Sequence, residues 1–99
     1  MNMKNLTRSN FDLSRFIHQL DLSSSTQDRA EAILIAAEQA GLASRRTPAS
    51  LMAAALYIAG ILEGERRTQK AIGQVTGVST TTIQTRYRQL VLELDIRSS

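Results

Sequence analysis

Four polar side chains near the C-terminus recur at the spacing of one helical face. At positions i, i+3, i+4 and i+7, they are Thr81, Gln84, Thr85 and Arg88. A glutamine amide can bond adenine bidentately, an arginine guanidinium can bond guanine or phosphate, and threonine offers a hydroxyl and a methyl group. On a helix these side chains project together. They indicate a surface for double-stranded DNA, on which Thr81, Gln84 and Thr85 would read bases.

Positive charge gathers in the same part of the chain. From residue 66 onward there are six basic and two acidic residues, a net charge of +4, whereas residues 1–65 hold six basic and seven acidic residues, a net charge of −1. This bias is expected of a chain that meets phosphate, although solvated basic faces are also common. The predicted phosphate contacts are Arg66, Arg67, Lys70, Arg86 and Arg88. Arg86 is the weakest candidate because it borders an apolar stripe.

Two helices are needed to position these side chains. Thr68 can cap a short helix over residues 69–76, and Gly77 suits the left-handed backbone of a tight turn. Ser79 can then cap a second helix, whose apolar stripe is Ile83, Tyr87, Leu90, Val91 and Leu94. A short helix, a glycine turn and a second helix form a helix-turn-helix, here over residues 68–94, whose second helix enters the DNA major groove.

A helical hairpin with a glycine turn is also a common structural element. The run Thr80-Thr81-Thr82 favours the DNA-binding interpretation, since β-branched residues lower helix propensity and are unusual in a purely structural helix. Within the short helix, Gly73 is expected at the point where it crosses its neighbour.

The longest apolar stretch, residues 47–62, predicts a buried central helix. Thr47 can cap it, and Pro48 fits the first helical position. From residue 51 to 62 there is no charged residue and no polar face, so the helix must be covered on all sides. A membrane span needs about 20 apolar residues, so neighbouring helices are the expected cover. Leu56, Ile58 and Ile61 should be almost fully buried.

Two amphipathic helices precede this core. The first is expected to start after Ser9 or Asn10, and its apolar stripe is Leu13, Phe16, Ile17 and Leu20. The second begins with a capping box at Ser24 and runs to Gly41, with an apolar stripe of Ala30, Ile33, Leu34 and Ala37. The chain is therefore expected to be all-α, with one domain over residues 10–96 and with residues 1–9 a linker or a non-native remnant.

Several classes of protein are disfavoured by the composition. The 99 residues include no cysteine and one histidine, which excludes a disulfide framework and the common structural zinc sites and fits a reducing intracellular compartment. We find no secretory signal. His18 has no partner that could complete a catalytic or metal site, and no glycine-rich phosphate loop is present. An enzyme is the least favoured class, and we predict no cofactor, no metal site and no membrane association.

A set of motifs, in order and at matching spacing, resembles the second cyclin-like repeat of archaeal transcription factor B, the counterpart of eukaryotic TFIIB. These motifs are Arg46-Thr47-Pro48-Ala49, Ala53-Ala54-Ala55-Leu56-Tyr57-Ile58-Ala59, Glu65-Arg66-Arg67-Thr68-Gln69, Gly77-Val78, and Thr82-Ile83 with Arg86-Tyr87-Arg88. The resemblance covers roughly residues 10–96. It implies a five-helix cyclin-like fold with the apolar third helix at its centre.

The resemblance also implies a function in transcription initiation. In this family, the helix-turn-helix of the second repeat binds the B-recognition element upstream of the TATA box, in a complex with TATA-binding protein. The base-reading positions fall on Thr81 and Gln84, where many members have valine and arginine, so the preferred sequence is open. The resemblance implies an archaeal cytoplasmic protein associated with the nucleoid, or a nuclear one if eukaryotic.

Two parts of the family's full-length protein have no counterpart here, namely the N-terminal zinc ribbon and the first cyclin repeat. We therefore expect an excised domain that is monomeric, binds DNA weakly alone, and meets TATA-binding protein and RNA polymerase through the full-length factor. Two alternatives stay open. One is a stand-alone helix-turn-helix repressor, which would need a self-complementary surface for a palindromic operator. The other is a cyclin-fold module that binds only protein through a groove at the third helix.

Overall fold

The computed structural model describes residues 8–43 and 47–96, which contain helices and no strand. The helices are α1 (Arg8–Gln19), α2 (Ser24–Gln39), α3 (Ala49–Leu62), α4 (Gln69–Thr76) and α5 (Thr80–Glu93). The predicted all-α fold of five helices is confirmed. Arg45, Arg46, Arg97 and residues 1–7 of the predicted linker lie outside the described residues.

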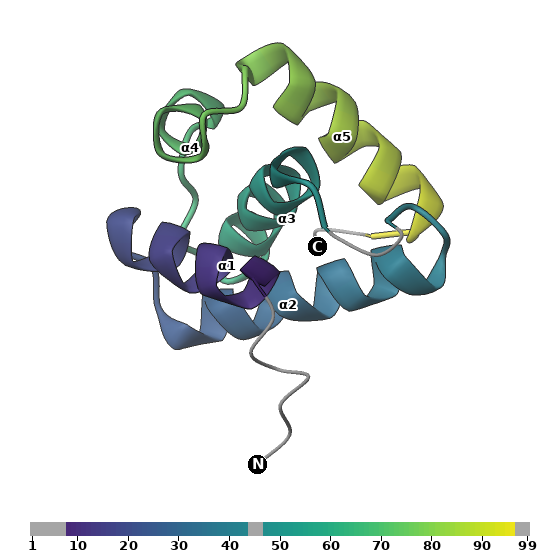
Figure 1. The fold of residues 1–99 in the computed structure, drawn as a ribbon, viewed down its shortest axis with the longest axis horizontal. Helices are drawn as coiled ribbons and strands as arrows, with labels where there is room; N and C mark the ends of the chain where they lie inside the picture. The colour runs from purple at the N-terminus through teal and green to yellow at the C-terminus, as the bar shows by residue number, and fades with distance from the viewer. Residues whose placement is uncertain (1–7, 44–46, 97–99) are drawn as a thin grey trace.

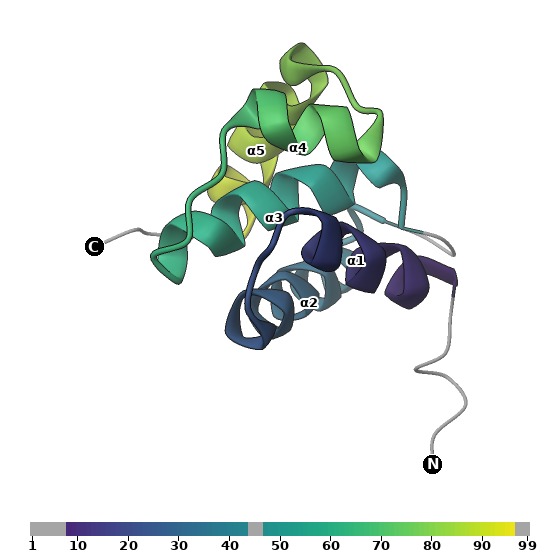
Figure 2. The ribbon, with the colours of Figure 1, turned by 90° about the vertical axis from the view of Figure 1, so that its left-hand side faces the viewer.

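The central position of α3 is plain in two views of the molecule. α1 and α2 cover one side of α3, and α4 and α5 cover the other (Figures 1 and 2). α3 packs against α2, α4 and α5, while α1 packs against α2 and α4. Neighbouring helices thus provide the cover that the apolar sequence requires. None of the described helices is long and apolar enough to cross a membrane.

The burial of α3 follows from its lack of a polar face. Every residue from 51 to 60 is buried, with Leu56 only 1% exposed and Ile58 only 3% exposed. The prediction is wrong for Ile61, which is half-buried. Its side chain lines a shallow groove that opens between the last turn of α3 and the C-terminal half of α5. The helix is fully enclosed in its middle and emerges at its end.

The segment that leaves α3 turns back sharply over Gly60. The Glu65 amide donates to the Gly60 carbonyl at 2.7 Å, and a Cβ atom at residue 60 would lie only 2.8 Å from the Glu65 carbonyl oxygen. A side chain larger than hydrogen would push this segment away. The close approach directs residues 63–68 toward the turn between α1 and α2.

The starts of three helices differ from the predicted positions. α1 begins at Arg8 rather than after Ser9 or Asn10. The side chain that caps α2 is that of Ser23, not Ser24, and it accepts from the Thr26 amide at 3.3 Å. α3 begins at Ala49, because Pro48 has an extended ψ of 154° and stands before the helix rather than in it.

The proline nevertheless starts the hydrogen-bond ladder of α3. Its carbonyl accepts from the amides of Leu51 and Met52 at 3.0 and 3.2 Å, as the carbonyl of a residue that precedes a helix does. The α3 cap has no side-chain hydrogen bond, so the predicted cap by Thr47 is wrong.

The apolar stripes of the first two helices are where the sequence predicts them. The four apolar residues of the α1 stripe are all buried, namely Leu13, Phe16, Ile17 and Leu20. In α2, Ala30, Ile33 and Ala37 are buried and Leu34 is half-buried. His18 is exposed, as expected for the polar side of α1.

Candidate nucleic-acid interface

The helix-turn-helix forms through three local signals in the sequence. The Thr68 hydroxyl accepts from the Ala71 amide at 3.0 Å, which caps α4. Gly77 adopts φ of +78° and donates its amide to the Gly73 carbonyl at 2.8 Å, which ends α4. The Ser79 hydroxyl accepts from the Thr82 amide at 3.2 Å, which caps α5. All three predicted signals are confirmed.

The crossing of the two helices depends on a second glycine. A Cβ atom at Gly73 would lie 2.6 Å from the Val78 carbonyl oxygen, and 3.8 Å from the side chain of Ile83. Only hydrogen fits at this point without displacing the turn. The predicted place of Gly73 at the crossing is therefore confirmed, and it brings the first residue of α4 close to the first turns of α5.

One side of α5 is anchored to the core. Ile83 and Leu90 are fully buried, and the ring of Tyr87 meets that of Tyr57 edge to face, with centroids 5.2 Å apart. Val91 and Leu94 are half-buried against the same core. The opposite side of α5 is thereby presented to solvent in a fixed orientation.

The predicted base-reading residues lie on this opposite side. Thr81 and Thr85 are exposed, and the Thr85 hydroxyl donates to the Thr81 carbonyl at 3.0 Å. Gln84 is half-buried, and its Oε1 accepts from Nε2 of Gln69 at 2.5 Å. Gln69 is not among the predicted site residues. Its position directly after the cap of α4 could have identified it, because the start of the first helix meets the second helix in this motif.

The predicted phosphate-binding residues fall into two groups in the structure. Lys70 and Arg88 are exposed, and neither side chain has an ion pair or hydrogen bond within residues 8–43 and 47–96. Arg66 is exposed, donates to the Tyr57 hydroxyl at 3.3 Å and lies 6.0 Å from the centre of that ring. These three side chains are available to an anion. Arg86 is half-buried and donates to Oε1 of Gln89 at 2.8 Å.

Arg67 is engaged within the protein. Its Nε donates to the Leu20 carbonyl at 2.9 Å and its Nη2 to the Asp21 carbonyl at 2.8 Å. Its Nη1 donates to the carbonyls of Glu65 and Arg66 at 3.2 and 3.3 Å. A guanidinium has five N–H donors, so these four bonds leave one for another partner. This role of Arg67 is not evident in the amino-acid sequence.

Glu65 makes a second connection to the same turn. Its Oε1 accepts from the Ser23 amide at 3.0 Å, from the Ser23 hydroxyl at 2.7 Å, and from the Thr26 hydroxyl. The hydroxyl of Thr26, then the hydroxyl and amide of Ser23, and finally the charge of Arg67, lower the pKa of Glu65 to about 2. A carboxylate from a distant loop thus does what glutamate at the third position of a capping box does locally.

Together Glu65 and Arg67 form what we term the α3–α4 clasp. The clasp binds the start of the helix-turn-helix to the turn between α1 and α2, through residues that are 39 to 47 positions apart in the chain. It therefore orients α4 relative to the rest of the domain. No group of three or more metal-ligating side chains occurs in the part of the chain that the structure describes.

An all-α domain that wraps four helices around a buried central one, and ends in a helix-turn-helix, is a cyclin-like domain. The model of the family described as "Transcription factor TFIIB repeat" matches residues 3–93. The chain belongs to this family, as its motifs predict.

Similar proteins carry the same designation. Transcription initiation factor IIB 1 of Thermoplasma volcanium is 45% identical over 84 residues, which cover 85% of this chain and 27% of the relative. Transcription initiation factor IIB 1 of Thermococcus kodakarensis is 44% identical over 85 residues, which cover 86% of this chain and 28% of the relative. Transcription initiation factor IIB of Methanopyrus kandleri is 45% identical over 84 residues, which cover 85% of this chain and 27% of the relative.

The chain spans little more than a quarter of the length of these relatives. Their designation as initiation factors agrees with the prediction that the chain is not an enzyme. It also agrees with the predicted class, a protein of transcription initiation.

Proposed function

We propose that this domain is the second cyclin-like repeat of an archaeal transcription factor B, and that α5 binds double-stranded promoter DNA. The observation that carries the proposal is the two-sided character of α5. Ile83 and Leu90 are fully buried, whereas Thr81, Thr85 and Arg88 are exposed on the other side. Such a helix can enter the major groove without disturbing the core.

The proposed target is the B-recognition element upstream of the TATA box, bound together with TATA-binding protein. Thr81, Gln84 and Thr85 are the proposed base-reading residues. The names of the relatives, all transcription initiation factors from archaea, support a promoter rather than an operator as the target. RNA polymerase would be met through the full-length factor, in the archaeal cytoplasm, and the isolated domain would be a monomer with weak affinity for DNA.

The proposed contacts to phosphate come from the exposed cations beside α5. Arg66, Lys70 and Arg88 are available for this purpose, and Arg86 is a weaker candidate because it is half-buried. Arg67 was predicted to join them. Because four of its five donors already bind carbonyls, we propose that its first role is to hold the α3–α4 clasp.

Titration of the chain against labelled duplex DNA at several salt concentrations tests the proposal. Affinity should fall with salt, and Arg88→Ala should flatten the slope of log K against log salt by about 0.9, the value for one phosphate contact. Arg15→Ala is the matched control, since Arg15 is an exposed arginine on α1. Binding without salt dependence, or an equal effect of the two variants, would contradict the proposed interface.

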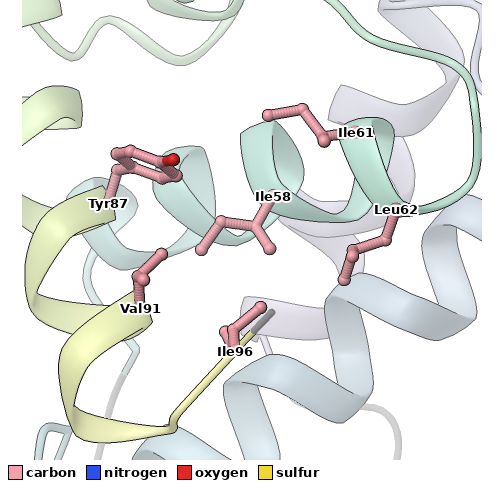
Figure 3. Close-up of a pocket in the computed structure, with 6 residues that line it drawn as sticks. All are labelled: Ile58, Ile61, Leu62, Tyr87, Val91 and Ile96. Carbon is pink, nitrogen blue, oxygen red and sulfur yellow. The ribbon is translucent and has the colours of Figure 1, made fainter. Parts of the chain in front are cut away.

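A second candidate function rests on the groove beside α3. Ile58, Ile61 and Leu62 of α3 face Tyr87 and Val91 of α5 across it, and Ile96 closes one end (Figure 3). This apolar surface favours a module that binds another protein there. A module that binds only protein would show no salt-sensitive affinity for duplex DNA, so the same titration separates the two candidates.

A further inference from the structure

We propose that Gln69 contributes to sequence specificity by restraining the Gln84 amide. The inference rests on the proposed function, because it names a residue that acts through a proposed base-reading one. Gln69 is a positioning residue in this account. It would act without touching DNA itself, by restraining the Gln84 amide where a base meets it.

The geometry joins the two helices of the motif at their closest ends. Gln69 is the first residue of α4, directly after the capping Thr68, and Gln84 lies one turn into α5. Nε2 of Gln69 donates to Oε1 of Gln84 at 2.5 Å, and both side chains are half-buried. Within residues 8–43 and 47–96, Gln69 is the one side-chain partner of Gln84. The orientation of this amide therefore depends on Gln69.

The hydrogen bond distinguishes the two ends of the amide. An amide oxygen has two lone pairs and an amide nitrogen has two hydrogens. With one lone pair of Gln84 occupied by Gln69, the other lone pair and both hydrogens remain for a base. If the Gln84 amide alone turned over, its nitrogen would face the nitrogen of Gln69, donor against donor. The Gln84 amide can therefore turn over only together with that of Gln69, so the hydrogen bond restrains it relative to a free side chain.

A restrained amide, which presents an acceptor beside a donor, matches one base in particular. Adenine presents an N6 donor beside an N7 acceptor, which pair with the free lone pair and an N–H of a glutamine amide. Guanine presents two acceptors, O6 and N7, which leave the amide oxygen unpaired. An amide that is free to rotate can form one hydrogen bond with either base. Gln69 should therefore raise the preference for adenine.

The experiment measures base preference with this domain in the full-length factor, in the complex with an archaeal TATA-binding protein and a TATA-box duplex. Each position upstream of the TATA box is varied in turn through four bases, and relative affinities are determined by competition. The wild-type chain should prefer adenine at one position, and Gln69→Ala should reduce that preference on the order of tenfold, within the range that one bidentate contact supplies. The salt slope should stay unchanged, since no phosphate contact is removed.

Two further variants make the result specific. Gln74→Ala is the matched control, because Gln74 is an exposed glutamine on the same helix and should leave every preference unchanged. Gln69→Glu supplies only acceptors, so it should turn the Gln84 amide over, reverse the order of acceptor and donor that a base meets, and reduce the preference for adenine. The added charge weakens binding to all duplexes alike and cancels in the ratio between bases.

Circular dichroism of each variant confirms that the fold is retained. A wild-type preference that Gln69→Ala leaves intact overturns the inference but not the proposed function. DNA binding without preference at any upstream position also overturns the inference, because there is then no selection for Gln69 to support. A full-length factor that binds no duplex in this complex overturns both.

Discussion

Replacing Arg67 with alanine tests whether this guanidinium stabilises the fold or meets DNA. Its bonds to the carbonyls of Leu20 and Glu65, at 2.9 and 3.2 Å, are partly buried, whereas those to Asp21 and Arg66 are exposed. Water can replace the exposed bonds. A hydrogen bond from a charged group contributes about 1.5–3 kcal/mol. Because Arg67 is half-exposed, we take the lower value for the two partly buried bonds and expect a loss of about 3 kcal/mol in the free energy of unfolding.

The neighbouring arginine provides the matched control. Arg66 has one side-chain hydrogen bond, to the Tyr57 hydroxyl at 3.3 Å, and lies over the ring of that tyrosine. An exposed cation–π contact contributes about 0.5–1 kcal/mol, so Arg66→Ala should lower the free energy of unfolding by no more than that amount. Urea denaturation of both variants at neutral pH measures the difference, provided that the m-value stays constant.

In DNA binding, the effect of Arg66→Ala should be larger than that of Arg67→Ala, the reverse of their order in stability. Arg66→Ala should flatten the slope of log K against log salt by about 0.9, because this side chain is exposed and keeps N–H donors for phosphate. Arg67→Ala should leave the slope unchanged once binding is measured well below the unfolding temperature. If Arg67→Ala flattens the slope and costs less stability than Arg66→Ala, the clasp is refuted and Arg67 is a phosphate contact.

The remaining predictions concern the core, acid stability and base preference. Leu56→Ala should lower the free energy of unfolding by about 2–5 kcal/mol, because the side chain is 1% exposed; a loss below about 1 kcal/mol in urea would show that α3 is not central. The pKa of Glu65 is lowered from 4.5 to about 2, so its contribution to stability is complete above pH 4.5 and is lost as the pH falls toward 2. Glu65→Gln should therefore flatten the fall of the urea midpoint across that range, and an unchanged acid limb would contradict this role. Gln84→Arg should gain preference for guanine at one position, on the order of 1–3 kcal/mol, in the complex with TATA-binding protein; base preferences equal to those of wild type would show that residue 84 touches no base.

Features that depend on neighbours in the sequence were predictable. Thr68, Gly77 and Ser79 act on amides or carbonyls within four residues of themselves, so their roles can be derived from capping rules alone. The burial of α3 was equally predictable, because the twelve residues from 51 to 62 carry no charge and form no polar face that could contact water. These local signals sufficed for the five helices and for the helix-turn-helix.

Features that depend on distant residues were not predictable in the same way. In the sequence, Arg67 is a cation near a predicted DNA-binding helix. Only the folded chain shows its hydrogen bonds to carbonyls 46 and 47 positions away. The sequence places Gln69 at the start of α4, near α5, but its hydrogen bond to Gln84, 15 positions away, is seen only in the folded chain. The partial exposure of Ile61 likewise depends on a distant element, because it is set by where α5 ends over α3. Such contacts follow from helix packing, which composition and periodicity do not define.

The central claim is that α5 reads promoter DNA beside the TATA box. Its most direct test is the selection of bound duplexes from a library randomised on both sides of a TATA box, with this domain in the full-length factor and TATA-binding protein present. If α5 reads these bases, particular bases are enriched immediately upstream of the TATA box, and the enrichment is lost when Thr81 and Gln84 are replaced by alanine. Selection of an inverted repeat would favour a repressor, and an absence of upstream enrichment would contradict the account.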